Sequence, residues 1–271
     1  MNKMTKGLVL GVAMAFPLLA QASTPLAGLI GTRHDFATRA MFLDTQVDKN
    51  GVAIAAGTAN AVGLCSYCHT PHSALSTSLL WNHKPSTNTF TWDEATTTGG
   101  TAYASIAPAY KGPTVKCLSC HDGSVAVGDV AMYTEKNSVV RNTYKVGDAV
   151  GSAIHKVGTG GAMGGNHPVG MPYPFGQVAN TYNSVSTGGE VVLTEFVTNP
   201  VNQNGTFVKL YNDASGTGSI TSGAVATKSG MECSTCHDPH NKATADDVFL
   251  RGKIKGSAVA DGYICIQCHI K

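Results

Sequence analysis

The sequence Cys65-Ser66-Tyr67-Cys68-His69 is the first of four copies of one pattern, Cys-x-x-Cys-His. Two thiols at this spacing form thioether bonds with the two vinyl groups on one edge of a haem, and the His that follows ligates the iron from its proximal side. The chain has eight cysteines, and the four copies use all of them. We therefore expect four covalently attached haem c groups. The other copies are Cys117-Leu118-Ser119-Cys120-His121, Cys233-Ser234-Thr235-Cys236-His237 and Cys265-Ile266-Gln267-Cys268-His269.

Two other arrangements of the cysteines stay open at this point. An exported protein can form four disulfides, and four Cys-x-x-Cys pairs can form two zinc sites of four thiolates each. Neither arrangement needs a His directly after the second Cys, whereas all four copies have one. Haem attachment is therefore the preferred interpretation.

The first 22 residues have the features of a secretory signal peptide. Lys3 and Lys6 carry positive charge, residues 7–20 are apolar but too few for a good membrane span, and Ala20-Gln21-Ala22 is a small-x-small cleavage site. No later segment is apolar enough to cross a bilayer. We therefore expect a secreted protein without a transmembrane segment.

The charge balance argues against a nucleic-acid partner. The chain has 19 basic and 17 acidic side chains, and loss of Lys3 and Lys6 with the signal peptide makes these numbers equal. Haem propionates, about two per haem, then make the mature protein net negative. Charged residues are 13% of the chain, against about 25% in an ordinary soluble domain, and such a surface tolerates self-association.

Residues 23–271 are expected to form a single tetrahaem unit with a multihaem cytochrome c fold. Each haem supplies a large rigid apolar surface, which leaves little need for a separate protein core. We predict loops and short α-helices that begin at the attachment motifs, with a few β-strands, wrapped around a haem chain. Residues 191–197 and 206–211 are rich in β-branched and aromatic residues, and Asn204-Gly205 between them predicts a β-hairpin.

The four motifs alternate between a long and a short kind. The first and third continue as Thr70-Pro71-His72 and Asp238-Pro239-His240, whereas the second and fourth lack this Pro-His. Internal repetition of this sort predicts two copies of a two-haem module, at about 23–135 and 136–271.

The sixth ligand of each iron decides whether a haem exchanges electrons or binds substrates. Six histidines remain after the four proximal ones, which is enough to fill every iron. His72 and His240 are the strongest candidates, because each lies three residues beyond a proximal His and can reach only a neighbouring haem. His34 and His167 come next, because they precede the two long motifs at matching places. We expect four haems with two His ligands each.

The other candidates are weaker. His83 follows Trp81-Asn82, and it could equally pack against a haem edge. His155 is expected to be a solvated bystander. Met163 and Met171 are expected to be packing residues, because spare histidines are available.

The motifs resemble those of a known family. In order, the stretches "HDF", "CSYCHTPH", "LWNH", "CLSCHDG", "HPVG", "CSTCHDPH", "FLR" and "CIQCH" are similar to the doubled-CXXCH multihaem cytochromes of metal-reducing bacteria. Within them they look most like the tetrahaem outer-surface cytochromes of Geobacter-type bacteria that polymerise into conductive filaments. The resemblance runs from about His34 to His269. Residues 94–110 and 137–230 match little beyond "HPVG".

The resemblance implies a continuous chain of stacked and T-shaped haem pairs through subunits arranged head to tail. It implies location at the outer cell surface or in an extracellular filament, with other multihaem cytochromes and extracellular electron acceptors as partners. It also implies that one sixth ligand comes from the adjoining subunit. We hypothesise that His34 is this donor, because a terminal arm can reach across an interface. A heterologous interface that does not close gives a filament.

The expected function is therefore extracellular electron transfer through a polymerised cytochrome filament, and not catalysis. Two alternatives stay open. A monomeric periplasmic or surface cytochrome would shuttle electrons between partners and would share every haem feature. A multihaem oxidoreductase would need an open iron site with a proton donor nearby, and no motif departs from the attachment pattern.

Overall fold

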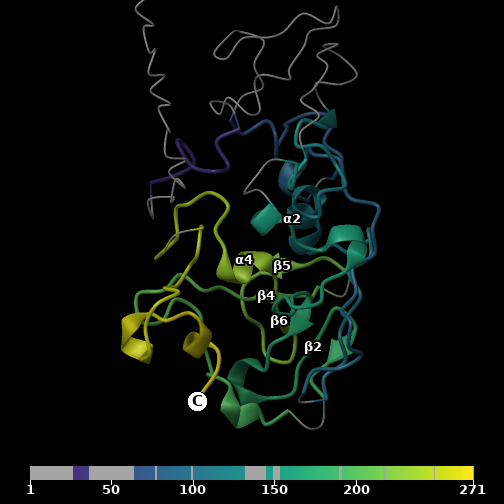
Figure 1. The fold of residues 1–271 in the computed structure, drawn as a ribbon. Coiled ribbons are helices and arrows are strands. Elements are labelled where there is room, and N and C mark those ends of the chain that lie inside the picture. The colour runs from purple at the N-terminus through teal and green to yellow at the C-terminus, as the bar shows by residue number, and fades with distance from the viewer. Residues whose placement is uncertain are drawn as a thin grey trace, which may run out of the picture.

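A computed structural model describes residues 27–36, 64–76, 78–98, 100–131, 145–148, 153–188, 191–215, 218–246 and 248–270 (Figure 1). The predicted signal peptide and the predicted boundary between the two modules lie outside these ranges. None of the helices within them is long and apolar enough to cross a membrane.

Loops make up most of the described chain, and its helices are short. The longest is α2 (Thr114–His121), which has eight residues, and α4 (Cys233–Cys236) has four. The remaining helical segments are single 3₁₀ turns. These are η1 (Ser78–Leu80), η2 (Ala153–His155), η3 (Thr159–Gly161), η4 (Phe175–Gln177), η5 (Leu193–Glu195), η6 (Val259–Asp261) and η7 (Cys265–Gln267).

Two small antiparallel sheets complete the regular structure of the described ranges. The larger has the strand order β1-β6-β4-β5, and β2 pairs with β3 in the smaller. Figure 1 shows β4, β5 and β6 next to α4, which follows β6 directly in the chain. The strands are β1 (Met171–Pro172), β2 (Thr181–Tyr182), β3 (Val185–Ser186), β4 (Tyr211–Asn212), β5 (Thr221–Ser222) and β6 (Ser229–Met231).

The helix α2 positions the second motif, and its ends are set by Pro and Gly. Pro113, whose fixed φ suits a helix start, stands at the N-cap, and the chain leaves the helix at Gly123, where φ is +72°. Val115 and Leu118 are three residues apart and so share one buried face. The motif cysteines, Cys117 and Cys120, are only partly exposed.

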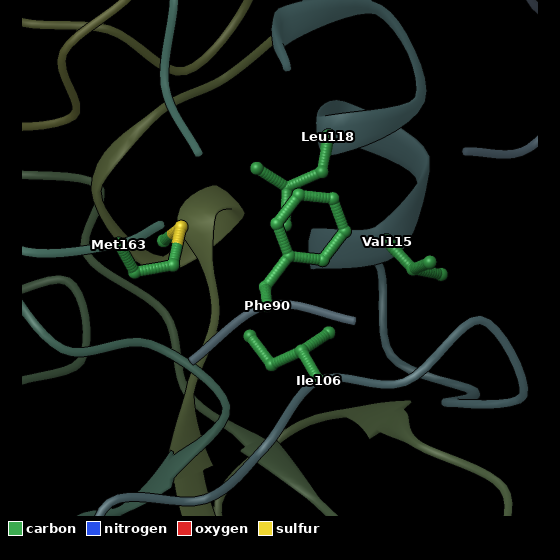
Figure 2. Packing of buried hydrophobic residues seen from close by; sticks show 5 residues of the cluster. All are labelled: Phe90, Ile106, Val115, Leu118 and Met163. Atoms are coloured by element: carbon green, nitrogen blue, oxygen red, sulfur yellow. The ribbon is translucent and has the colours of Figure 1, made fainter. Parts of the chain in front are cut away.

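The larger apolar cluster holds α2 in place. Val115 and Leu118 pack there with side chains from three loop segments. Figure 2 shows Phe90 between the helix and Ile106, with Met163 on the other side of the ring. Met163 therefore packs as expected, and Met171 is also buried, with its sulfur accepting from the Ala104 N–H at 3.3 Å.

The predicted hairpin is wrong. Residues 191–197 contain η5 and form no strand, and only the last residue of 206–211 belongs to one, β4. The first run bonds to the fourth motif instead, because the Val197 N–H donates to the Cys268 carbonyl at 3.0 Å and the Ile270 N–H to the Glu195 carbonyl at 2.7 Å. Long-range partners therefore outcompete the local turn.

Candidate functional site

The attachment motifs lie on turns and short helices. The first occupies turns at 64–68, the second ends α2, the third forms α4 and the fourth begins at η7. All eight cysteines are free thiols. The described ranges also contain no group of three or more His, Cys, Asp or Glu side chains that could hold a metal ion. Neither the disulfides nor the four-thiolate zinc sites are therefore formed in this structure.

Cysteines of successive motifs lie close together. The pKa of Cys120 is raised by burial and, to a lesser extent, by the nearby Cys68 thiol of the first motif. Burial, with a smaller contribution from Cys236, raises the pKa of Cys268 to about 12. The second and third motifs meet through a hydrogen bond between the thiols of Cys117 and Cys233. The four motifs therefore form one continuous cluster, in chain order.

Three proximal histidines each face another His at a similar distance. A metal–imidazole bond is about 2 Å, so two rings on opposite sides of one iron have centroids about 6 Å apart. In every pair the second ring belongs to a His that was expected to be a sixth ligand. The pairs are His69 with His240 at 6.0 Å, His121 with His34 at 6.1 Å, and His269 with His167 at 6.4 Å. This donor set fits haem iron, which takes two axial protein ligands.

Backbone carbonyls orient the proximal rings. The Nδ1 atom of His69 lies 2.6 Å from the Leu79 carbonyl oxygen, that of His121 lies 2.7 Å from the His155 oxygen, and that of His237 lies 3.0 Å from the Val248 oxygen. A carbonyl oxygen can only accept, so each Nδ1 carries the proton. The opposite nitrogen, Nε2, is therefore left with a lone pair for a metal.

His34 lies beside His121 of the same chain. Its ring stacks on Phe249 at 4.6 Å, and its Nδ1 donates to the Pro239 carbonyl at 3.3 Å. Desolvation, and to a smaller extent His121, lower the pKa of His34 to about 4, which keeps the ring neutral as a ligand must be. This placement opposite His121 of the same chain does not support the cross-subunit role expected for His34.

The fourth proximal His differs from the others. All ten histidines lie in the described ranges, and none has its ring at a comparable distance from His237. His72 is the one strong candidate that these pairs leave over, and it lies exposed beyond Pro71. His237 is therefore the one proximal His that no second His ring faces at the distance of these pairs.

His83 and His155 have other roles. His83 is 1% exposed, its Nε2 lies 2.9 Å from the Ala126 carbonyl oxygen, and its Nδ1 is buried without a hydrogen-bond partner. Nε2 therefore carries the proton in a bond within the fold, and His83 belongs to none of the three imidazole pairs. His155 contributes its carbonyl to the orientation of His121, a role that sequence patterns do not reveal.

The loops after the first and third motifs share one backbone geometry. The proximal N–H donates to the carbonyl of the first Cys in each, from His69 to Cys65 at 2.8 Å and from His237 to Cys233 at 3.0 Å. Each loop then returns to form an antiparallel β-bridge with its proximal His, Trp81 with His69 and Leu250 with His237. Positive φ angles recur at matching places, Ser73 with Asn241, Leu79 with Val248 and Leu80 with Phe249. The two loops are therefore structural equivalents, with one extra residue in the second.

A buried carboxyl joins the second and third motifs. Glu232 is 0% exposed, and it accepts from the Thr114 N–H at 3.0 Å and the Tyr182 hydroxyl at 2.6 Å, with Tyr110 as a third donor. Thr114 in turn accepts from the Cys233 N–H at 3.1 Å. These bonds tie the start of α2 to the start of α4. Burial raises the pKa of Glu232, and the hydrogen bonds oppose this.

Comparison with known protein families gives no match, and comparison with curated proteins gives no match either.

Proposed function

We propose that this chain is an electron-transfer protein that holds four covalent c-type haems, each with two axial histidines. The observation that carries the proposal is the set of three imidazole pairs at 6.0–6.4 Å, each joining a proximal His to a remote one. When bound, the haems supply one-electron exchange with little change of structure. The cysteines attach them, the carbonyl bonds orient the proximal rings, and the second His excludes substrates.

The repeat assigns His72 to the remaining iron position. His240 of the third-motif loop reaches His69 of the first motif. Because the first loop has the same geometry, its equivalent residue, His72, is the ligand expected to reach a third-motif proximal His, His237. His72 is exposed in the single chain, so it can serve either its own subunit or an adjoining one.

The polymeric form depends on which subunit His72 binds. If His72 binds the iron at His237 of the next subunit, the interface is heterologous and does not close, which gives a head-to-tail filament. We propose that this filament lies outside the cell and passes electrons to extracellular acceptors. His72 takes over the cross-subunit role that the sequence suggested for His34.

The test begins with the holoprotein expressed with c-type maturation. Its intact mass should include four haems, and electron paramagnetic resonance should show only low-spin iron. Replacement of Cys265 and Cys268 by Ala should remove the mass of one haem and leave three. Fewer than four haems in the wild type would overturn the proposal. Electron microscopy then separates a filament from a monomeric shuttle.

A second candidate function rests on His237, which faces no other His ring in this structure. An open iron there would suit an oxidoreductase instead of a conduit. High-spin iron in the assembled wild-type protein, together with cyanide binding that needs no unfolding, would support the oxidoreductase function. Low-spin iron that becomes high-spin only in His72→Ala would exclude it.

A further inference from the structure

The two equivalent loops differ in charge at two matched positions. Asn82 and Arg251 both donate through their backbone N–H to the second Cys of their motif, at 2.9 Å and 2.8 Å. Both side chains then donate to a Ser carbonyl inside the motif. Thr70 and Asp238 likewise occupy one position, directly after the proximal His. A neutral Thr-Asn pair in the first loop therefore corresponds to an Asp-Arg ion pair in the second.

The ion pair is buried. The Arg251 Nη2 atom lies 3.5 Å from Asp238 Oδ1, and the two side chains are 6% and 7% exposed. The carboxylate also accepts from the backbone N–H groups of Lys242 at 2.9 Å and Ala243 at 2.7 Å. Hydrogen bonds of this kind stabilise the ionised form, and in a desolvated site both charges act strongly on their neighbours.

The two charges act unequally on two histidines. At His240 the Asp238 carboxylate has the largest effect of these charges, and Lys209 and Arg251 oppose it, whereas Arg251 acts on His237 without Asp238. Arg251 Nε donates to the His237 carbonyl at 3.2 Å, so the cation lies beside the third proximal ligand. Asp238 Oδ1 accepts from the His240 N–H at 3.2 Å and lies 3.9 Å from the ring atom Nδ1. His240 faces His69, so the anion lies beside an axial ligand of the first haem. Half-buried Lys209 lies near both charges and acts on both.

We propose that the Asp238–Arg251 pair makes the reduction potential of the haem at His237 higher than that of the haem at His69. A cation near an iron stabilises the added electron, whereas an anion against an imidazole Nδ1 makes that ligand more electron-donating and stabilises the oxidised iron. One electron therefore moves from the reduced centre at His69 to the oxidised centre at His237, without a proton. This inference rests on the proposed function.

The pair also holds the loop, because Arg251 donates to the carbonyls of Phe207 at 3.4 Å and Ala243 at 3.3 Å. Removing the charge alone would therefore confuse a potential effect with an unfolding effect. The chain itself offers a matched replacement: Asp238→Thr with Arg251→Asn installs in the second loop the neutral pair that the first loop uses. The reciprocal variant is Thr70→Asp with Asn82→Arg, which installs the ion pair in the first loop.

The experiment is an optical redox titration of the holoprotein, with haem count and low-spin spectra measured on every sample. We expect the Asp238→Thr/Arg251→Asn variant to keep four low-spin haems and to show a narrower spread of midpoint potentials. Arg251→Asn alone should lower one potential, and Asp238→Thr alone should raise another. The reciprocal variant should raise the potential of the haem at His69 and also narrow the spread. Lys255→Gln, which removes an exposed cation, is the control and should shift the potentials less.

The outcomes separate the two proposals. If both double variants keep four low-spin haems and the wild-type difference between highest and lowest midpoint potentials, the inference about the ion pair is overturned and the proposed function stands. A wild-type protein with fewer than four haems would overturn the proposed function and this inference with it. If the second-loop variant loses haem, the reciprocal variant decides alone.

Discussion

The imidazole rings of His69 and His240 lie 6.0 Å apart and within 26° of parallel, although 171 positions of sequence numbering separate them. One is the proximal His of the first motif, and the other belongs to the tail of the third. A single iron between these rings would join the first and second halves of the chain. The proposed haem at this place is therefore a cross-link within the fold as well as an electron carrier.

The first prediction concerns this pair. His240→Ala should leave four attached haems, because attachment depends on cysteines, but one haem should lose its sixth ligand and become high-spin. Electron paramagnetic resonance of the purified protein measures this directly. His83→Ala is the matched control: His83 is buried but belongs to none of the three imidazole pairs, so four low-spin haems should remain. High-spin iron in the control would contradict the assignment.

The second prediction separates ligation within the subunit from ligation across an interface. His34→Ala should produce one high-spin haem even in dissociated monomers, because His34 faces His121 of its own chain. His72→Ala should affect His237, and should stop filament growth if the contact is between subunits. Electron microscopy and spectra of the same samples report both. Monomers of His34→Ala that keep every haem low-spin would show that the contact with His121 does not ligate iron.

The third prediction is a pH dependence. The pKa of buried Glu232 is raised, so folding favours its protonated form. Its contribution to the free energy of unfolding is complete below the ordinary value of 4.5 and decreases as the pH rises towards the raised value. Glu232→Gln cannot titrate at this position. Its free energy of unfolding, measured by chemical denaturation between these pH values, should therefore lack this decrease with pH. Exposed Glu195→Gln should retain it, and an equal slope in both variants would contradict the prediction.

The fourth prediction tests the apolar support of α2. Leu118 is 1% exposed and packs within the cluster that Figure 2 shows. Leu118→Ala should lower the free energy of unfolding by about 2–5 kcal/mol, because it removes buried contacts and leaves a cavity. Leu80 is 48% exposed, and Leu80→Ala should change stability by less than about 0.5 kcal/mol. Denaturant titration of both variants measures the difference.

Local chemistry made part of the site predictable. A Cys-x-x-Cys-His segment carries its whole attachment chemistry within five residues, so spacing alone predicts the eight attaching cysteines and the four proximal histidines. A loop-rich chain with short helices was also expected, and the structure has one. An α-helix begins at the motif only in the third case, because the second motif ends α2, the fourth begins a 3₁₀ turn and the first lies on turns. The hairpin over 191–211 failed, because the run at 191–197 found its hydrogen bonds at the fourth motif, about 70 positions away.

The sequence by itself determined the four Cys-x-x-Cys-His motifs and so the proposed haem attachment, since that chemistry depends on neighbours along the chain. Only the tertiary structure decided which remote His faces which proximal one, that His34 lies opposite His121, and that Glu232 joins α2 to α4. It also set the buried Asp238–Arg251 pair against two different ligands. These relationships depend on contacts between segments far apart in the chain, and local sequence patterns do not determine such contacts.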